Sequence, residues 1–307
     1  MRTPTTEYSP IVQWRLNSKL EGSYYVKYGT GDLQWKKIDS AAAQMLLSIG
    51  CVSLPPLLAG PAYTGRMGTS LRMSDGIGIR MKEQYENRSL CLLPRRTYTI
   101  IRADGKAFHS YTRKLSRPFD SLLIQCMDWA AITMCESVQG TNLGYVQSDE
   151  ISLILTDFAT KDTAAWYDNN LQKIVSVAAS IATMAFNERA RELGLHPTAT
   201  FDARAFVIPD REEAMNYFVW RQQDATRNSI QSVAQSMYSP KELNGKNCDM
   251  LQEMIFQKGT NWNDLKPTLK HGRAIIKTEQ GWEADPNTPV FTQDRAYLGQ
   301  RIPVPGY

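Results

Sequence analysis

Acidic residues stand where two runs rich in apolar and β-branched residues end. Asp104 and Gly105 follow the run "TIIRA", and Asp149 with Glu150 separates the runs "NLGYVQS" and "ISLILTD". Carboxylates on neighbouring strands form the oxygen-rich kind of site that Mg²⁺ prefers. Two such ions about 4 Å apart stabilise the attacking and leaving oxygens of a phosphoryl transfer. These residue types therefore point to metal-dependent phosphoryl chemistry.

The residues that follow Asp104 suit a phosphate-bearing ligand. Gly105 lets a backbone carbonyl approach a metal ion, and the amides from Lys106 to His109 open a predicted helix and face phosphates. Each feature also has a simpler interpretation: Asp-Gly is a common turn, acidic residues at a hairpin tip are often only turn residues, and a lone histidine is often a structural hydrogen-bonding group. Taken together, the features favour a palm-type nucleotidyl-transfer site.

A particular order of strands and helices is needed to bring these carboxylates together. Apolar spacing and cap residues predict the following segments: strand 96–103, helices 106–115 and 118–138, strands 142–148 and 151–157, helix 171–194, strand 199–210 and helix 211–238. The order β-α-β-β-α-β predicts an α+β fold, a palm-type (ferredoxin-like) antiparallel sheet with helices on one face. In such a sheet the first strand lies beside the hairpin, so Asp104 and Asp149 meet at one edge.

The residues before this pattern predict a separate, small β-rich module. Three short strand-like runs are followed by a helix pattern over 39–50 and by a linker rich in Pro, Gly and Ser. We therefore expect two domains, residues 1–73, whose function the sequence does not reveal, and residues 74–307, the nucleotidyltransferase domain with a C-terminal tail. The aromatic residues of the first domain can stack on RNA bases or form its small core.

The composition is that of a soluble globular protein, with 42% hydrophobic and 21% charged residues among 307. A net charge of +4 permits nucleic-acid binding without requiring it. The five cysteines and three histidines lack metal-ligand or redox spacing, which argues against a zinc site. No apolar run approaches the roughly 20 residues that span a bilayer, and the N-terminus lacks a signal-peptide core. We expect a cytoplasmic protein.

Three motifs closely resemble the tRNA-His guanylyltransferase family, especially its bacterial and phage-like members. They occur in the family's order within about residues 76 to 270: "RADGKAFHSYT", "GYVQSDEISLIL" and "FDARAFVIPD…YFVWRQQDATRNSIQ". The resemblance implies a polymerase-like palm that runs in reverse and adds nucleotides to the 5′ end of a tRNA. It also implies two Mg²⁺ ions, GTP and ATP as substrates, tRNA as partner and a homotetrameric assembly.

The resemblance assigns roles to residues of the first two motifs. Asp104 and Asp149 would bind both Mg²⁺ ions, and Gly105 would add its carbonyl. Glu150 is a candidate catalytic residue because it matches a family position next to the metal ligand. The remaining candidates would line the triphosphate pocket: Lys106, Ala107, Phe108, His109 and Ser148.

The third motif places Arg221, Asp224 and Asn228 on one helix face, because they are three and four residues apart. They either form an intrahelical ion pair with a hydrogen-bonding neighbour or contact the nucleotide or the tRNA. Eukaryotic members carry His-Ile-Asn-Asn-Leu-Tyr after this aspartate, whereas residues 225–230 read "ATRNSI". The altered run resembles the guanylyltransferase-like branch that extends 5′-truncated tRNAs, which leaves tRNA-His-specific G addition and general 5′-end repair both open.

Two other functions use similar features. A palm-type nucleotidyl cyclase would have similar carboxylates but would need no tRNA, so products formed from GTP alone distinguish it. A non-catalytic RNA-binding protein could keep the fold, but loss of a metal carboxylate would be its signature, and both Asp104 and Asp149 are present.

Overall fold

The computed structural model describes residues 13–16, 24–27, 36–38 and 76–306. By its internal contacts the chain divides into two compact units, Met1–Met73 and Ser74–Tyr307. Because the two units are separate bodies, each is described by itself.

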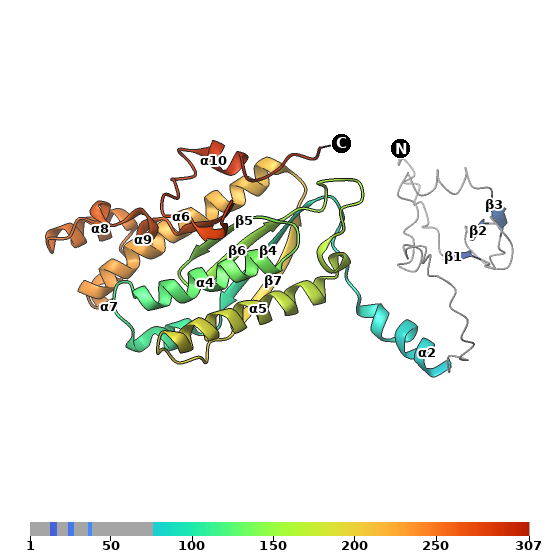
Figure 1. The fold of residues 1–307 in the computed structure, drawn as a ribbon, viewed down its shortest axis with the longest axis horizontal. Helices are drawn as coiled ribbons and strands as arrows, with labels where there is room; N and C mark the ends of the chain where they lie inside the picture. The colour runs from blue at the N-terminus through green and yellow to red at the C-terminus, as the bar shows by residue number, and fades with distance from the viewer. Residues whose placement is uncertain (1–12, 17–23, 28–35, 39–75, 307) are drawn as a thin grey trace, which may run out of the picture. The chain divides into compact units, whose positions relative to one another are not determined.

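The first unit contains three short strands, which lie within the three runs predicted from the sequence. They are β1 (Gln13–Leu16), β2 (Tyr24–Lys27) and β3 (Lys36–Ile38), and they form an antiparallel sheet in the order β1-β2-β3 (Figure 1). The helix predicted over 39–50 and the linker that follows it lie outside the described residues.

The second unit is built on a six-stranded antiparallel sheet in the order β7-β4-β6-β5-β8-β9. The strands are β4 (Tyr98–Gly105), β5 (Thr141–Gln147), β6 (Glu150–Leu155), β7 (Phe201–Ile208), β8 (Arg273–Thr278) and β9 (Gly281–Ala284). The first four have the predicted split β-α-β order, with β4 next to β6. The sequence predicts a tail after the last long helix, whereas the structure has a hairpin there, β8–β9, which extends the sheet beyond β5.

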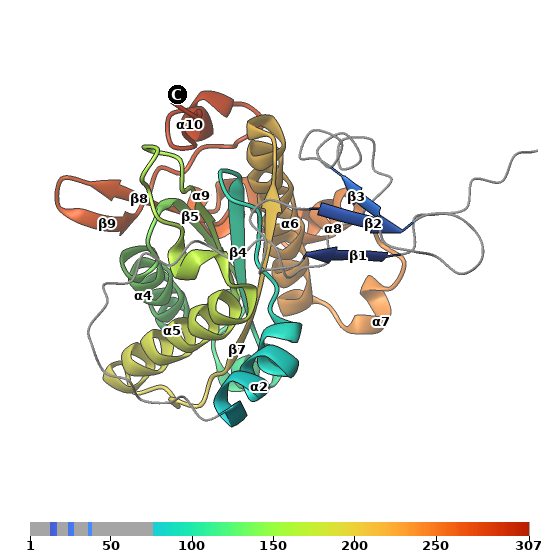
Figure 2. The same cartoon turned by 90° about the vertical axis from the view of Figure 1, so that its right-hand side faces the viewer.

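Three long helices cover the sheet: α4 (Ser121–Ser137), α5 (Leu171–Glu192) and α6 (Arg211–Met237). α4 and α5 pack on one face and α6 lies across the other (Figure 2). The prediction of helices on one face was therefore wrong. Tyr98 to Ile101 are all buried, so β4 has an apolar residue on both sides and both faces need a cover.

Small residues let the α4–α5 layer approach the sheet closely. Ala130, Ala178, Ala182 and Ala185 are completely buried in one hydrophobic cluster with Ile101 and Ala103 of β4. The N-cap of α4 is Asp120, whose carboxylate accepts the backbone amides of the helix's first turn at 2.9 and 3.0 Å. The alanine packing and the N-cap hold the α4–α5 layer against the sheet.

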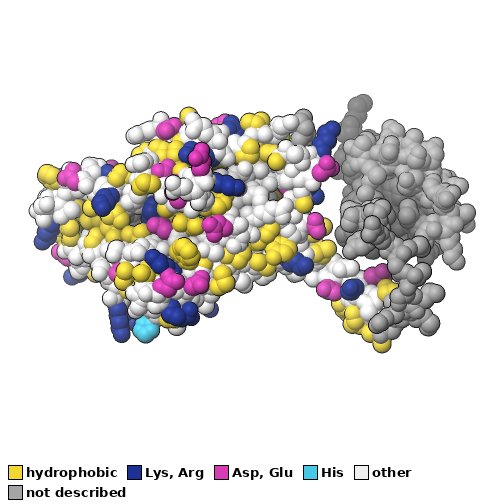
Figure 3. Space-filling model, viewed as in Figure 1, with side chains coloured by type: hydrophobic (Ala, Val, Ile, Leu, Met, Phe, Trp, Pro, Cys, Tyr) yellow, Lys and Arg dark blue, Asp and Glu magenta, His cyan; other side chains and the backbone are white. Residues whose placement is uncertain are grey.

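The remaining elements are short. They are α2 (Gly76–Gln84), η2 (Glu86–Ser89), α3 (Phe108–Tyr111), η3 (Thr112–Lys114), η4 (Trp166–Asn169), α7 (Pro240–Leu243), α8 (Cys248–Gln257), η5 (Trp262–Asp264), α9 (Pro267–Lys270) and α10 (Arg295–Gly299). Among the helices of the described residues, none has the length and apolar character needed to cross a membrane. Acidic and basic side chains are interspersed over the described surface visible in Figure 3.

Candidate active site

Asp104 and Asp149 come from the end of β4 and from the hairpin turn beside it. Asp104 lies directly opposite Glu150 of β6, the residue that follows Asp149. The backbone amide of Gly105 donates a hydrogen bond of 2.9 Å to the carbonyl of Asp149. The strand end and the turn are thus joined through the backbone, although they are far apart in the sequence.

A pocket of about 410 Å³ opens at this junction. Its lining contains every residue of the first two motifs that was predicted to bind nucleotide, except Lys106. The residues around it are Asp104, Gly105, Ala107, Phe108, His109, Thr112, Leu123, Ser148 and Asp149.

The two carboxylates give this pocket uncompensated negative charge. Burial raises the pKa of the Asp149 carboxyl, a hydrogen bond of 3.0 Å from the Ser148 hydroxyl opposes that rise, and the Asp104 carboxylate adds to it. Within the described part of the chain, neither aspartate forms an ion pair. Oxygen donors and unbalanced negative charge fit Mg²⁺, which commonly takes one or two protein carboxylates and completes its shell with water and substrate phosphates.

The described residues do not contain a group of three His, Cys, Asp or Glu side chains that could hold a metal ion. A divalent ion at Asp104 and Asp149 would therefore need further oxygens from the backbone or from a bound ligand. The site fits a metal that arrives with a nucleotide better than a resident structural metal.

Gly105 is required by its neighbour Phe108. A Cβ atom at residue 105 would lie 2.4 Å from a ring carbon of Phe108. That ring is 4% exposed and packs against the rings of Phe186 and Phe201, with centroids 5.4 and 5.2 Å away. The Phe108 side chain therefore belongs to the core, and its contribution to the pocket comes from its backbone.

The backbone amides after Gly105 are not equivalent. The amide of Lys106 donates to the carbonyl of Thr200 at 2.8 Å, so it is not free for a phosphate. Within the described residues, the amides of Ala107, Phe108 and His109 have no hydrogen-bond acceptor. Three donors at the start of α3 therefore remain for an anion, while the Lys106 and His109 side chains are exposed.

Two residues of the pocket have a left-handed backbone without being glycine. Ala107 has φ = 56° and Ser148 has φ = 49°. Such conformations cost about 1–3 kcal/mol each and concentrate at functional sites. The pocket thus combines backbone strain, free amides and close carboxylates.

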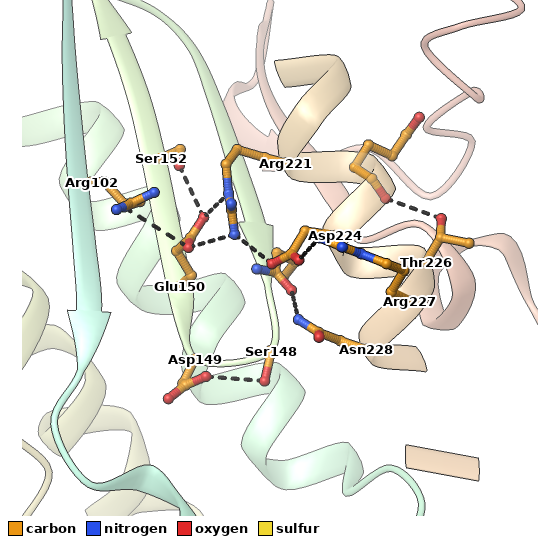
Figure 4. A network of polar contacts seen from close by, with 12 residues as sticks. Arg102, Ser148, Asp149, Glu150, Ser152, Arg221, Asp224, Thr226, Arg227 and Asn228 are labelled. Atoms are coloured by element: carbon orange, nitrogen blue, oxygen red, sulfur yellow. Dashed lines mark hydrogen bonds and ion pairs between the residues drawn. The ribbon is translucent and has the colours of Figure 1, made fainter. Parts of the chain in front are cut away.

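Glu150 has a different environment from Asp149. The sequence predicts a turn at Asp149-Glu150, whereas the turn is Ser148-Asp149, because Glu150 pairs with Gln147 as the first residue of β6. Its side chain is buried and accepts hydrogen bonds from Arg221 at 2.7 and 2.8 Å. Figure 4 shows Asp149 pointing away from this pair.

The third motif forms a chain of charges along α6. Arg221 is 5% exposed and donates to Asp224 at 2.7 Å, and Asp224 also accepts from the exposed Arg227. The intrahelical ion pair is therefore present. Burial raises the pKa of Glu150 and the Arg221 guanidinium opposes that rise. Arg221 thus contacts Glu150, the first residue of β6 after the hairpin turn.

Asn228 lies in a second pocket of about 320 Å³ and donates to Gln147 at 3.4 Å. Both pockets are lined by His109, Thr112, Leu123 and Ser148, so they adjoin. The lining of this second pocket is mixed: serines and carboxamides, including Gln147 of β5 and Asn228 of α6, lie among apolar residues.

The sequence predictions missed Gln147 and Thr112. Gln147 is a buried polar residue that directly follows the run "LGYV" of β5, and a polar residue at the end of such a run is a recognisable signal. Thr112 follows Phe108 by four residues, so it lies on the same face of the short helical segment, and its hydroxyl donates to the Phe108 carbonyl at 2.8 Å.

The sequence pattern of the family described as tRNAHis guanylyltransferase matches residues 79–209. A bacterial tRNA(His) guanylyltransferase (Thg1)-like protein solved in complex with ATP is 43% identical to this chain, with a TM-score of 0.71. The matched region covers 74% of this chain and 100% of that one. This chain belongs to the tRNA-His guanylyltransferase family. It is therefore a nucleotidyltransferase of a tRNA-processing family.

Other members have the same fold or sequence pattern. A bacterial Thg1-like protein in complex with GTP is 42% identical with a TM-score of 0.66, covering 75% of this chain and 100% of that one. The probable tRNA(His) guanylyltransferase of Dictyostelium discoideum is 28% identical over 203 residues, 61% of this chain and 77% of that protein. The matched pattern includes both aspartates of the pocket, whereas Arg221, Asp224 and Asn228 lie beyond it.

Proposed function

We propose that this guanylyltransferase-family enzyme adds nucleotides to the 5′ end of tRNA in the 3′-to-5′ direction, with ATP and GTP as substrates. The observation that carries the proposal is the pocket at the end of β4. Its lining includes two aspartates without an ion pair and three residues whose backbone amides have no acceptor among the described residues. The bound ATP and GTP of the bacterial structures support a nucleotide as its ligand. The sheet then serves as the palm of a polymerase-type domain.

Asp104 and Asp149, together with the Gly105 carbonyl, are the residues that would hold two Mg²⁺ ions. When bound, Mg²⁺ supplies charge neutralisation to the oxygens of the phosphoryl group. The amides of Ala107, Phe108 and His109 bind the triphosphate with Ser148, and the Lys106 side chain adds a point charge.

The family's chemistry gives the reaction that these residues would support. The tRNA 5′ end is activated as an adenylate or a triphosphate, and the 3′-hydroxyl of the incoming nucleotide attacks the activated phosphorus. A new P–O bond forms, and AMP or pyrophosphate leaves. Asn228 and Gln147 line the adjoining pocket, where they are placed to contact the nucleoside. Arg221 and Asp224 position Glu150 instead of contacting the substrate.

Incubation of the enzyme with 5′-truncated tRNA, Mg²⁺, ATP and labelled nucleotides, followed by sizing of the RNA, tests this function. We expect RNA lengthened at its 5′ end, and no product without tRNA. A cyclic nucleotide formed from GTP alone would instead identify a cyclase, and RNA binding without any product would identify a non-catalytic RNA-binding protein.

The run from Ala225 to Ile230 predicts templated repair in preference to fixed addition of G. These residues replace the histidine and one asparagine of the eukaryotic run. With tRNAs that lack their first 5′ nucleotide, we expect incorporation to follow Watson–Crick complementarity when the opposing base is varied. Addition of G opposite every base would contradict templated repair and support addition of the tRNA-His type.

Replacement of Lys106 by alanine should weaken GTP binding about tenfold, the equivalent of about 1.4 kcal/mol, and leave tRNA binding nearly unchanged. Because the Lys106 amide is already bonded to Thr200, only the side-chain charge can contribute. Titration with GTP and with tRNA measures both effects. Lys277→Ala removes an exposed lysine of β8 and serves as the matched control. Equal losses for both ligands would rule out a specific triphosphate contact.

Residues 74–307 are proposed to carry the nucleotide site alone, with residues 1–73 as an appended RNA-contacting module. A protein that lacks residues 1–73 should keep its GTP affinity and bind tRNA more weakly, by a factor that shrinks as salt rises. Loss of GTP binding would show that the boundary is misplaced. We also propose that this protein forms the homotetramer that the family resemblance implies and that it is cytoplasmic. Light scattering measures the oligomeric state.

A further inference from the structure

The sheet face that carries Asp104 is only partly covered by α6. Tyr98 and Ile100 are buried beneath this helix, but the next residue on the same face is Arg102. Residues two apart on a strand are about 7 Å apart on one face, so Arg102 lies between the covered core and Asp104. A side chain at this position adjoins the candidate active site.

Arg102 is a cation with one buried donor, Nε, that has no hydrogen-bond partner among the described residues. Within the described part of the chain its guanidinium as a whole makes no hydrogen bond. Its Nε forms a long ion pair with Glu150, whose carboxylate oxygen is 4.0 Å away and therefore beyond hydrogen-bond distance. Figure 4 shows the guanidinium beside Glu150 on the sheet. An unsatisfied buried donor is costly, so an acceptor supplied by a ligand would stabilise it.

An exposed tryptophan lies next to this cation. Trp220 of α6 is 47% exposed, and the Arg102 guanidinium carbon is 5.8 Å from its ring centroid. Arg221 holds the same ring at 4.3 Å, and Tyr217 contacts it edge-on at 5.9 Å. The ring is therefore held in place while much of its surface faces solvent.

The strand register adds a second arginine. Arg102 lies directly opposite Arg204 of β7, and in the next row Asp104 lies opposite Asp202. Like charges directly opposite each other destabilise a sheet, although Arg204 gains an ion pair of 3.6 Å with Asp202. The row of two arginines lies next to the row of two aspartates. This arrangement suits an RNA strand whose phosphates contact the arginines and whose reacting 5′ end reaches Asp104.

We propose that Trp220, Arg102 and Arg204 form a platform for the 5′-terminal nucleotide of the RNA substrate. Trp220 stacks on the terminal base, and Arg102 binds the adjacent phosphate. An RNA end fits because only an end or an unpaired nucleotide exposes a base face, and aromatic rings between arginines are the usual means of binding one. The platform rests on the proposed function, since it presents the 5′ end to Asp104.

The test uses a tRNA acceptor stem that carries 2-aminopurine, a fluorescent adenine analogue, as its 5′-terminal nucleotide. We expect the full-length protein to quench it on binding. Trp220→Ala should abolish the quenching and weaken RNA binding about tenfold, with GTP binding unchanged. Trp220→Phe, which keeps an aromatic face, should restore most of both effects.

Trp129→Ala is the matched control. Trp129 is 44% exposed and also faces an arginine, Arg189, at 6.0 Å, but it lies on α4 across the sheet. It should behave as wild type. Arg102→Gln should lower the slope of log affinity against log salt by about 0.7, the value for one phosphate of a single strand.

Wild-type quenching and RNA affinity in Trp220→Ala would overturn the platform, as would equal losses in Trp129→Ala. An unchanged salt slope in Arg102→Gln would overturn the phosphate contact. Failure of the proposed function has a different signature: a wild-type protein that quenches the terminal base but adds no nucleotide supports the platform and contradicts the activity.

Discussion

Replacing Asp104 or Asp149 by asparagine should lower nucleotide addition at least about 100-fold while the protein stays folded. Each change removes one of the two carboxylates that line the pocket and keeps the shape of the side chain. Loss of one preorganised electrostatic contact typically costs 10²–10³ in rate, and a metal ligand is such a contact. Incorporation of labelled nucleotide into 5′-truncated tRNA measures the activity, and circular dichroism measures the fold.

The matched control for these variants is Asp162→Asn. Asp162 is an exposed aspartate in the loop after β6, outside the pocket. The Asp162→Asn variant loses the same charge as the other two variants but outside the pocket, so we expect its activity to stay near that of the wild type. If Asp104→Asn or Asp149→Asn also kept near-normal activity with Mg²⁺, the two aspartates would not be the metal ligands.

Replacing Arg221 by methionine should lower the free energy of unfolding by about 3–5 kcal/mol, because the buried Glu150 carboxylate loses both hydrogen bonds from its close cation and keeps only Arg102, 4.0 Å away. Urea unfolding near neutral pH measures the change. Arg227→Met is the control, since Arg227 is exposed and an exposed ion pair is worth about 0–1 kcal/mol. Replacing Glu150 and Arg221 together by methionine should recover most of the loss.

The deficit of Arg221→Met should shrink as the pH falls. Burial raises the pKa of Glu150. Arg221 and the more distant Arg102 oppose that rise, and the variant keeps only Arg102, so the pKa of Glu150 rises further. A carboxyl group whose pKa is higher in the folded than in the unfolded state favours folding once it is protonated. Urea unfolding at about pH 8 and about pH 5 should therefore show the larger deficit at the higher pH. A deficit independent of pH would show that lost packing, and not the charge of Glu150, is its cause.

The strands and long helices of the second unit follow from local features of the sequence. Apolar periodicity and the short turn between β5 and β6 are set by residues close together in the chain, so these elements were predicted nearly in place, although α4 begins after its N-cap Asp120 and not at Pro118. The order β-α-β-β-α-β then limited the sheet to the split arrangement that has β4 beside the hairpin. For the same reason, Asp104 and Asp149 could be expected at one edge.

Register and packing partners depended on the tertiary structure. A shift of one residue in the hairpin turn decided that Glu150 enters β6 and meets Arg221, 71 residues away. The free amides at Ala107, Phe108 and His109 were distinguished from that of Lys106 only by the contact with Thr200. The β8–β9 hairpin needed the exposed edge of β5 to pair with.

The sequence by itself therefore determined which residues can do chemistry and which elements carry them, because propensity, capping and periodicity act over a few residues. Only the tertiary structure decided where each of those residues lies and which partners it contacts. It placed Asp104 and Asp149 in the pocket, buried Glu150 with Arg221, and left Arg102 and Trp220 beside the site. Burial and long-range pairing set these outcomes, and both arise from packing between segments that no local pattern relates.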